Sequence, residues 1–360
     1  MEIEAIKKSW AGVRFWIISA SMVIVVAGMK EMRNLILMIL MAVFITAVSL
    51  TPFQWLSKKK VPEVLALILV IITIMGILYG FVILLGASVN GFSERLPFYQ
   101  ERFDELWLSA HHSLVSAGLV DKDANMMNII ESTNIMKSSG SAVASVGKLV
   151  SDPLITMFIY IFMMLEVTIF GKKMKLLSPN ALGGIQVIVG NIRKYFAVKF
   201  LTSFSTGLVI YLGLLWIGVD FPLLWGLIAF ILNFIPSIGS IFAAIPAVLL
   251  AFIQLDPISG LLTGILYLVT NVLIGSIIEP PLMGRNLGLS PFIVFVSILL
   301  WGFVLGPVGM LISAPLTMII KIIFDNRKTT HAVGIILGDK SSLKLLEEEK
   351  TKEKEGIDFS

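Results

Sequence analysis

The feature that most constrains this chain is a pair of long segments without a charged residue. Phe221–Leu255 and Asn286–Ile320 each run for 35 residues without Asp, Glu, Lys or Arg. A straight helix of that length would measure about 50 Å, well beyond the roughly 30 Å hydrocarbon core of a bilayer. Proline and glycine interrupt each segment near its middle, at Pro236, Gly239, Gly306, Pro307 and Gly309. Because proline breaks the helical hydrogen-bond ladder, we expect two broken helices or re-entrant hairpins.

The rest of the chain adds shorter apolar segments of membrane-spanning length. We expect these spans at 15–29, 35–56, 64–89, 153–170, 200–219 and 257–278. The composition agrees, since 57% of the residues are hydrophobic and only 14% are charged, whereas soluble domains carry about 25% charged residues. The sequence therefore predicts an all-α polytopic integral membrane protein with about eight membrane segments, two of them broken or re-entrant.

Four regions follow from this layout. Residues 1–89 hold the first three spans, and 90–152 form a polar, amphipathic helical insert. Residues 153–320 form the membrane core, which contains 221–255 and 286–320, and 321–360 form a charged tail. Basic residues flank cytoplasmic ends of membrane helices, and here they gather at Lys58–Lys60, in the stretch 171–199 that includes Lys199, and after residue 320. We therefore expect both termini to be cytoplasmic and the insert to be external, whether the two broken segments each cross the membrane or each turn back. If they turn back, they enter from opposite sides.

The two broken segments also resemble each other. Pro222, Pro236 and Pro246 recur as Pro291, Pro307 and Pro315. One interpretation is chance among apolar segments that contain proline. The other is a structural repeat, the usual architecture of secondary transporters.

Several kinds of chemistry are not supported by the sequence. There is no cysteine, so disulfides and thiolate chemistry are excluded. We find neither a His-Glu-x-x-His zinc motif nor a phosphate-binding Gly-Lys-Ser/Thr loop. We therefore predict no cofactor, no metal and no enzymatic activity. The net charge of +4 comes from basic residues at the ends of apolar segments, so we expect a lipid bilayer and no nucleic acid as partner.

The broken segments hold the candidate residues of a path for a small polar solute or a monovalent cation. Where a helix breaks, its unpaired backbone groups are tolerated at membrane depth only against protein or a water-filled cavity. Ionisable residues inside a membrane segment are functional candidates. The candidate path residues are Asn233, Pro236, Ser237, Gly239, Ser240, Asn271, Glu279, Arg285, Gly306, Pro307, Gly309 and Pro315. The alternatives are that the prolines and glycines only shape and pack helices, that Glu279 and Arg285 lie in an interfacial turn, and that Asn271 bonds between helices.

Several ordered motifs in the second half resemble a known family, the autoinducer-2 exporters or PerM-type permeases. They are the segments 211–219, 233–240, 279–291, 301–310 and 314–317, of which Asn-Phe-Ile-Pro-Ser-Ile-Gly-Ser at 233–240 is typical. The amino-acid sequence of these motifs resembles that of the family's quorum-signal transport variant. The resemblance implies about eight spans, an inner-membrane location, export of a small solute and a homo-oligomer, with a pentamer as the expected count. One departure stands out, because the family often has Gly-Gln where this chain has Val198 and Lys199.

Three functional hypotheses remain open at this point. The leading one is a secondary exporter of a small polar metabolite, with autoinducer-2 or a related sugar-like signal as first candidate. The second is a sodium(lithium)/proton antiporter, for which Glu279 is the best ion carrier. The third is a non-transporting membrane scaffold that recruits partners through residues 90–152 or the tail.

Overall fold

The computed structural model describes residues 2–117, 153–177, 179–236, 238–283, 288–325 and 330–339. These residues are almost entirely helical, and their one β-bridge joins Leu289 to Gly338. Five of the described helices are long and apolar enough to cross a membrane, and shorter apolar helices accompany them. The predicted all-α polytopic membrane fold is confirmed.

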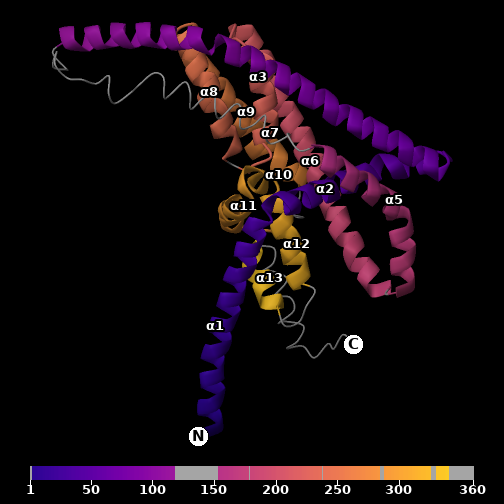
Figure 1. The fold of residues 1–360 in the computed structure, drawn as a ribbon. Coiled ribbons are helices and arrows are strands. Elements are labelled where there is room, and N and C mark those ends of the chain that lie inside the picture. Colours follow the sequence, from indigo (N-terminus) through magenta and orange to yellow (C-terminus); the bar gives the residue numbers. More distant parts are fainter. Residues whose placement is uncertain are drawn as a thin grey trace.

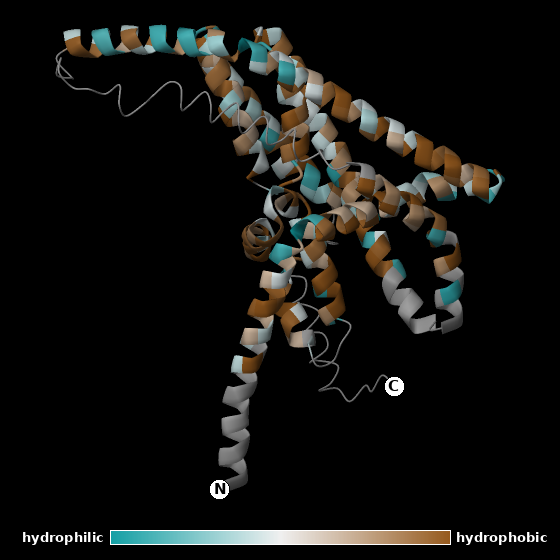
Figure 2. Ribbon diagram, in the orientation of Figure 1, coloured by the Kyte–Doolittle hydropathy of each residue, from teal (hydrophilic) through white to brown (hydrophobic). Residues whose placement is uncertain are grey.

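Three helices form the N-terminal third: α1 (Glu2–Glu31), α2 (Arg33–Lys58) and α3 (Glu63–Ser116). The 54 residues of α3 join the third expected span to the beginning of the polar insert without a break. At about 1.5 Å per residue this helix is about 80 Å long, so it extends far beyond a bilayer. Figure 2 shows hydrophilic residues interleaved along its far end. Residues 118–152 of the expected insert lie outside the described residues.

Helix α6 (Pro179–Ile217) is the central element of the membrane core, and α5 (Pro153–Leu177) precedes it. It unites the expected basic stretch and the expected fifth span in one 39-residue helix. It packs against α7, α9, α2, α5 and the elements that follow α9. Side chains from several elements therefore meet along α6.

The first broken segment is a helical hairpin of α7 (Pro222–Leu232) and α8 (Gly239–Gln254). Its two ends meet, because Gln254 accepts a hydrogen bond from the backbone N–H of Asp220 (2.7 Å) and donates one to the Gly218 carbonyl (3.2 Å). The arms of 11 and 16 residues measure about 16 and 24 Å, less than the bilayer core of about 30 Å. The hairpin interpretation of 221–255 is confirmed.

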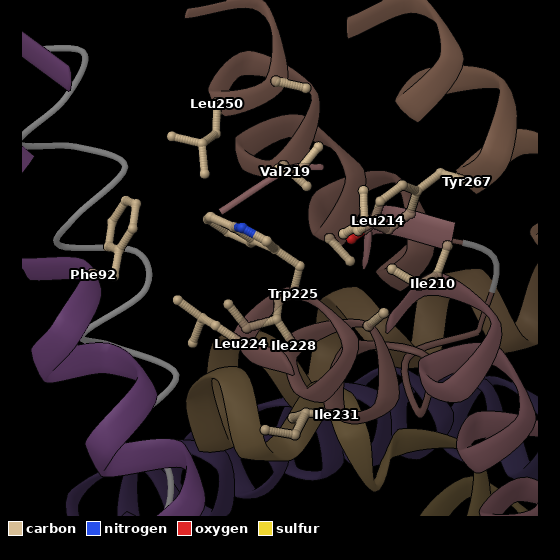
Figure 3. Packing of buried hydrophobic residues seen from close by; sticks show 14 of the residues in the cluster. Phe92, Ile210, Leu214, Val219, Leu224, Trp225, Ile228, Ile231, Leu250 and Tyr267 are labelled. Carbon is tan, nitrogen blue, oxygen red and sulfur yellow. The ribbon is translucent and has the colours of Figure 1, made fainter. Parts of the chain in front are cut away.

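Aromatic packing anchors this hairpin to α3. Trp225 of α7 is fully buried, and its ring meets that of Phe92 of α3 edge-on, with centroids 5.5 Å apart. Figure 3 shows Trp225 surrounded by Phe92, Val219 and Leu250, which come from three different parts of the chain. Packing between these distant segments holds the hairpin against α3, so this side of the hairpin contacts protein.

The next segment differs from the ordinary span expected there. Helix α9 (Pro257–Thr270) continues into a π-helix, η2 (Asn271–Ile278), and then into α10 (Glu279–Met283). Asp256 caps the start of α9 by accepting hydrogen bonds from the backbone N–H groups of Ile258 (2.8 Å) and Ser259 (2.9 Å). The segment is long and apolar enough to cross a membrane as a whole, but its last part is wound more loosely than an α-helix.

The second broken segment is also a hairpin, formed by α11 (Pro291–Leu311) and α12 (Ser313–Asp325) and followed by α13 (His331–Leu337). The chain turns inside α11 at Gly306, whose φ of 72° favours glycine. The first arm therefore ends before Gly306, and the second consists of the rest of α11 and α12. Away from the turn, the Trp301 indole N–H of the first arm donates to the Thr317 hydroxyl of the second at 3.0 Å. A methyl group placed on Gly288, before the first arm, would lie 3.7 Å from the Lys321 ammonium in the second, so the ends meet here too.

The bases of the two hairpins lie at opposite ends of the molecule. The first base is tied to α3 by the Arg95–Asp220 ion pair (2.9 Å), and the second to α13 by the bond from the Ser290 N–H to the Leu337 carbonyl (3.1 Å). The beginning of α1 lies toward the α13 end (Figure 1). Each hairpin also begins with a proline, Pro222 or Pro291, in its first turn. The arrangement agrees with a repeat inserted in opposite directions.

Candidate functional site

A face of buried polar side chains runs along α6. It consists of Tyr195, Lys199, Thr202, Ser203 and Thr206, and each is at most 4% exposed. The spacing of four, three, one and three residues places all five on one side of a helix. We call this set the polar face of α6. Buried polar groups need partners, and the partners identify the elements that converge here.

Lys199 and Glu279 form a buried ion pair. The Lys199 ammonium lies 2.6 Å from Oε1 of Glu279, and the two side chains are only 3% and 16% exposed. The Thr202 hydroxyl donates to the other carboxylate oxygen, Oε2, at 3.2 Å. Both oxygens of Glu279 therefore have partners on α6. Lys199 lies inside the membrane-length segment Gln186–Ile217, where a lone charge would be costly.

The π-helix η2 directly precedes Glu279. A π-helix has i to i+5 hydrogen bonds and occurs mostly as short insertions at functional sites. Because its turn takes more residues than an α-turn, it rotates every later side chain about the helix axis. Glu279 consequently faces α6 in a direction that α-helical periodicity from residue 257 would not give.

The tip of the first hairpin is bonded to the same polar face. The Asn233 amide donates to the Ser203 hydroxyl at 3.0 Å, deep in the protein, and the Ser240 hydroxyl lies 3.5 Å from the Asn233 carboxamide oxygen. Close contact allows this, since an added methyl at Gly207 would lie only 2.7 Å from the Gly226 carbonyl oxygen. Asn233 and Ser240, two of the candidates beside the break, are thus linked to α6, Asn233 directly and Ser240 through Asn233.

The backbone at this tip is less open than the sequence suggested. The N–H groups of Phe234, Ile235, Ile238 and Gly239 donate to carbonyls within the turn, at 2.7 to 3.3 Å. Pro236 lies half-buried inside that turn. The expectation that the break frees these amides is wrong in this conformation, because the short turn satisfies them locally. Side chains, rather than these N–H groups, present the polar atoms.

Tyr195 connects the polar face to the second hairpin. Its side chain is 3% exposed, and its hydroxyl has no hydrogen-bond partner among the described residues. It packs with Met283 of α10 and Ala314 of α12, and it lies close enough to Glu279 to interact with the carboxylate electrostatically. An unpartnered buried hydroxyl is unusual, which makes this end of the polar face a candidate contact for a polar ligand.

The other candidates in the second hairpin lie in packing positions. Gly309 packs so tightly against the Trp301 carbonyl that a side chain would clash, and Pro315 is buried in α12. At the turn, Gly306 and Pro307 lie beside α2, where a methyl placed on Gly306 would be 3.0 Å from the Arg33 guanidinium. Arg33 is therefore the polar group nearest to this tip.

The remaining sequence candidates are not joined to the polar face. Asn271 lies along its own helix, where its Oδ1 would be 3.1 Å from a methyl group placed on Gly275. Within the described parts of the chain it makes no hydrogen bond to another helix, so the expected interhelical bond is not found. Ser237 and Arg285 lie outside the described residues. Glu279 begins α10, and its side chain is 16% exposed.

A pocket of about 450 Å³ lies between α6 and the α9–η2–α10 segment, within the ~300–1,000 Å³ of typical small-molecule sites. Its wall is mostly aliphatic, with hydroxyls from Thr202, Ser205 and Thr270. Thr202 thus borders the pocket and also bonds Glu279. The pocket opens toward the outside of the bundle, since Leu201 and Leu273 in its wall are about half exposed.

Sequence reasoning missed all five residues of the polar face of α6: Tyr195, Lys199, Thr202, Ser203 and Thr206. It grouped Lys199 with the cytoplasmic basic residues, which is wrong because Lys199 is buried against Glu279. Two signals were available. Lys199 stands at the departure from the Gly-Gln pattern, and polar residues recur at helical spacing at 199, 202, 203 and 206 of an otherwise apolar segment.

Broken helical hairpins, a central helix with a buried polar face and several membrane-length helices define a polytopic membrane protein of the transporter class. The chain belongs to the AI-2E family of transporters, whose family model matches residues 19–328. It is 30% identical over 322 residues to the putative transport protein YhhT of Escherichia coli (strain K12), covering 89% of this chain and 92% of that protein. It is 31% identical over 332 residues to the AI-2 transport protein TqsA of the same organism, covering 91% and 96%.

A more distant relative is the putative transport protein YrrI of Bacillus subtilis (strain 168), 22% identical over 316 residues that cover 83% of this chain and 89% of that protein. The family assignment supports a transport role and does not favour the scaffold hypothesis. A transporter family also fits the expectation of a protein without catalytic activity.

Proposed function

We propose that this chain is a secondary exporter of a small polar metabolite, with autoinducer-2 as the first substrate to test. The observation that carries the proposal is the buried polar face of α6, which contacts Asn233 at the first hairpin tip and Glu279 at the end of η2. A polar solute needs such groups along its route through an apolar bilayer. The 31% identical relative whose name assigns it to AI-2 transport supports this choice of substrate.

The expected mechanism is alternating access. The two hairpins and α6 form the moving unit around the polar face, and spans one to four form the scaffold. The candidate contacts for the solute are Asn233, Ser240, Ser203, Thr202, Tyr195 and Glu279, while Pro236 and Gly239 shape the turn that presents the first two. Rocking of this unit against the scaffold would open the polar face to one side of the membrane at a time.

The test is efflux from proteoliposomes that contain the purified protein. Vesicles are loaded with autoinducer-2, a proton gradient is imposed, and solute loss is followed beside internal pH. We expect loss above protein-free vesicles, diminished by Pro236→Ala at the hairpin tip. Pro97→Ala, which changes a proline inside α3, is the matched control and should transport normally. Absence of solute loss from the wild-type vesicles would rule out autoinducer-2 as substrate.

A sodium(lithium)/proton antiporter is the second candidate, because Glu279 is an ionisable group inside a membrane-length segment. The Lys199 ammonium already occupies that carboxylate, so antiport requires Lys199 to move away in part of the cycle. In the same vesicles, antiport predicts a change of internal pH when sodium or lithium is added, abolished by Glu279→Gln. A pH change that survives Glu279→Gln would remove Glu279 as carrier.

We propose a cell-membrane location, inner in a two-membrane cell, with both termini cytoplasmic and residues 90–152 external.

The family resemblance further implies a homo-oligomer, for which a pentamer is the expected count. Native mass spectrometry of the protein released from detergent should give five copies; a monomer at micromolar concentration would contradict the proposal.

A further inference from the structure

We propose that the Lys199 ammonium is a built-in counter-ion of Glu279, which takes the place of a coupling cation, so that transport by this chain requires neither a proton nor a sodium gradient. The inference rests on the proposed transport function and specifies its energetics. It concerns the one buried ion pair within the membrane core that the described residues contain.

The argument begins with the charge on Glu279. A carboxylate enclosed in a membrane bundle is neutralised by a proton, by a dissolved cation or by a basic side chain. Here the side chain is present: Lys199 lies 2.6 Å from Oε1 while Thr202 bonds Oε2. Each oxygen thus has a partner on α6, and the ammonium already compensates the negative charge, so no additional cation is needed for neutrality.

Among the described residues of the neighbouring elements, Lys199 is the basic side chain that pairs with Glu279. From α6 itself, Tyr195 also interacts with Glu279, but a phenol is neutral at physiological pH. Arg193 of α6 instead donates to Thr51 and Gln54 of α2. On α12, Lys321 pairs with Asp325, and on α5, Lys173 pairs with Glu166. The described segments α7, α9 and η2 contribute no Asp, Glu, Lys or Arg.

A tethered counter-ion and a dissolved one have different consequences for transport. A dissolved cation that binds in one orientation and leaves in the other is carried across, so its gradient drives the solute. Lys199 is covalently attached to α6 and remains with Glu279, so the pair contributes the same net charge in every state. Export then follows the solute's own gradient, which suffices for a compound made inside the cell.

The position also supplies the most informative variant. Lys199→Gln removes the charge but keeps a long polar side chain at the same place on α6. Glu279 must then take its compensating charge from solution. We therefore expect Lys199→Gln to make the protein dependent on pH or on sodium, whereas Lys199→Arg, which keeps the positive charge, should stay independent.

The first measurement is efflux of autoinducer-2 from proteoliposomes at equal internal and external pH, at about pH 6, 7 and 8, in sodium or in N-methylglucamine. We expect wild-type efflux to vary less than about twofold across these conditions. Without sodium, Lys199→Gln efflux should fall by up to about tenfold for each unit by which the pH rises, because Glu279 then loses the proton that neutralises it. Two results would overturn the inference. One is wild-type efflux that requires a proton or sodium gradient, and the other is Lys199→Gln efflux that depends on neither pH nor sodium.

The second measurement needs no substrate, so it separates this inference from the proposed function. Thermal unfolding of the purified protein is followed under the same conditions. The Lys199→Gln melting temperature should rise with added sodium or with falling pH, and those of the wild type and the double variant Lys199→Gln/Glu279→Gln should not. If autoinducer-2 never moves but these melting curves behave as described, the substrate is wrong and the counter-ion stands. A double variant whose melting temperature responds to sodium would overturn the counter-ion proposal. This outcome can be measured even if Lys199→Gln alone fails to fold.

Discussion

At the scale of single residues, two ion pairs of equal length differ in their surroundings. Lys199–Glu279 and Lys173–Glu166 both measure 2.6 Å, but the first pair is 3% and 16% exposed and the second 58% and 51%. Water screens an exposed pair, so its contribution is about 0–1 kcal/mol. Removing one partner of a buried pair leaves an uncompensated charge and costs about 3–5 kcal/mol. Burial, rather than distance, decides the importance of each pair.

A stability comparison checks this difference. We expect Glu279→Gln to lower the free energy of unfolding by about 3–5 kcal/mol because Lys199 stays buried without its partner. The double variant Lys199→Met/Glu279→Met should recover most of that loss. Glu166→Gln is the control and should change stability by at most about 1 kcal/mol. The measurement is thermal unfolding in detergent, and equal effects of the two single variants would contradict the assignment.

Asp256 gives a prediction about pH. Hydrogen bonds from Ser259, first from its backbone N–H, hold the pKa of Asp256 below its usual value of 3.8. A depressed pKa stabilises the fold above the unfolded-state pKa, and that contribution is lost as the pH falls through the native value. The melting temperature of Asp256→Ala should therefore lie below that of the wild type at about pH 6 and approach it at about pH 2. A constant difference across this range would show that the charge plays no part.

At the scale of elements, α6 and α7 cross through two glycines. A methyl group on Gly207 would lie 2.7 Å from the Gly226 carbonyl oxygen, and one on Gly226 would lie 2.8 Å from that of Gly207. Small residues permit this approach in membrane bundles. The crossing brings Asn233 within reach of Ser203, so it positions the hairpin tip on the polar face.

Substitution at the crossing should therefore affect both stability and transport. Gly207→Ala is expected to destabilise by about 1–3 kcal/mol, since the backbones must separate. Gly190→Ala is the matched control on the same helix, where nothing lies within 4 Å of the added methyl, and the higher helix propensity of alanine should make it neutral or slightly stabilising. Melting temperatures and efflux rates of the two variants check this. A Gly207→Ala protein as stable as Gly190→Ala would refute the crossing.

At the scale of the whole molecule, Asp220 links the first hairpin to the long helix α3. Its carboxylate accepts hydrogen bonds from Arg95 (2.9 Å) and from the Tyr99 hydroxyl (2.7 Å), and its backbone carbonyl accepts one from the Trp225 indole N–H (3.0 Å). The hairpin base is thus fixed at the end where α3 leaves the bundle. The second hairpin base is fixed at the other end by α13.

This arrangement predicts which positions are accessible from each side of the membrane. The chain has no native cysteine, so single cysteines can be introduced directly. Pro222→Cys and Leu255→Cys should react with an impermeant maleimide from the same side, and Ser290→Cys and Ile323→Cys from the opposite side. Labelling in intact cells and inverted vesicles makes the comparison. Opposite sidedness of Pro222→Cys and Leu255→Cys would exclude the hairpin.

Much of the fold could be predicted from the sequence because the bilayer restricts it. Segments of about 20 apolar residues must be helical in lipid, so most spans follow from hydropathy. The charge-free runs are too long for one crossing, and their prolines mark the turns. Asp220 and Asp256 mark the ends of membrane segments, because a charged side chain is costly inside the bilayer. These properties depend on neighbouring residues in the chain, and the sequence determines them by itself.

The site was decided by tertiary packing. Lys199 and Glu279 are 80 residues apart, and neither residue alone indicates the other as its partner. Their pairing depends on the π-helix η2, which rotates Glu279 toward α6, while the Gly207–Gly226 crossing brings Asn233 to the same polar face. The crossing is a contact between segments that are distant in the sequence. The sequence therefore determined a polytopic helical protein with two interrupted segments. Only the three-dimensional structure folded those segments into hairpins and placed a compensated charge beside the polar face, because that requires helices to meet at a particular rotation and depth.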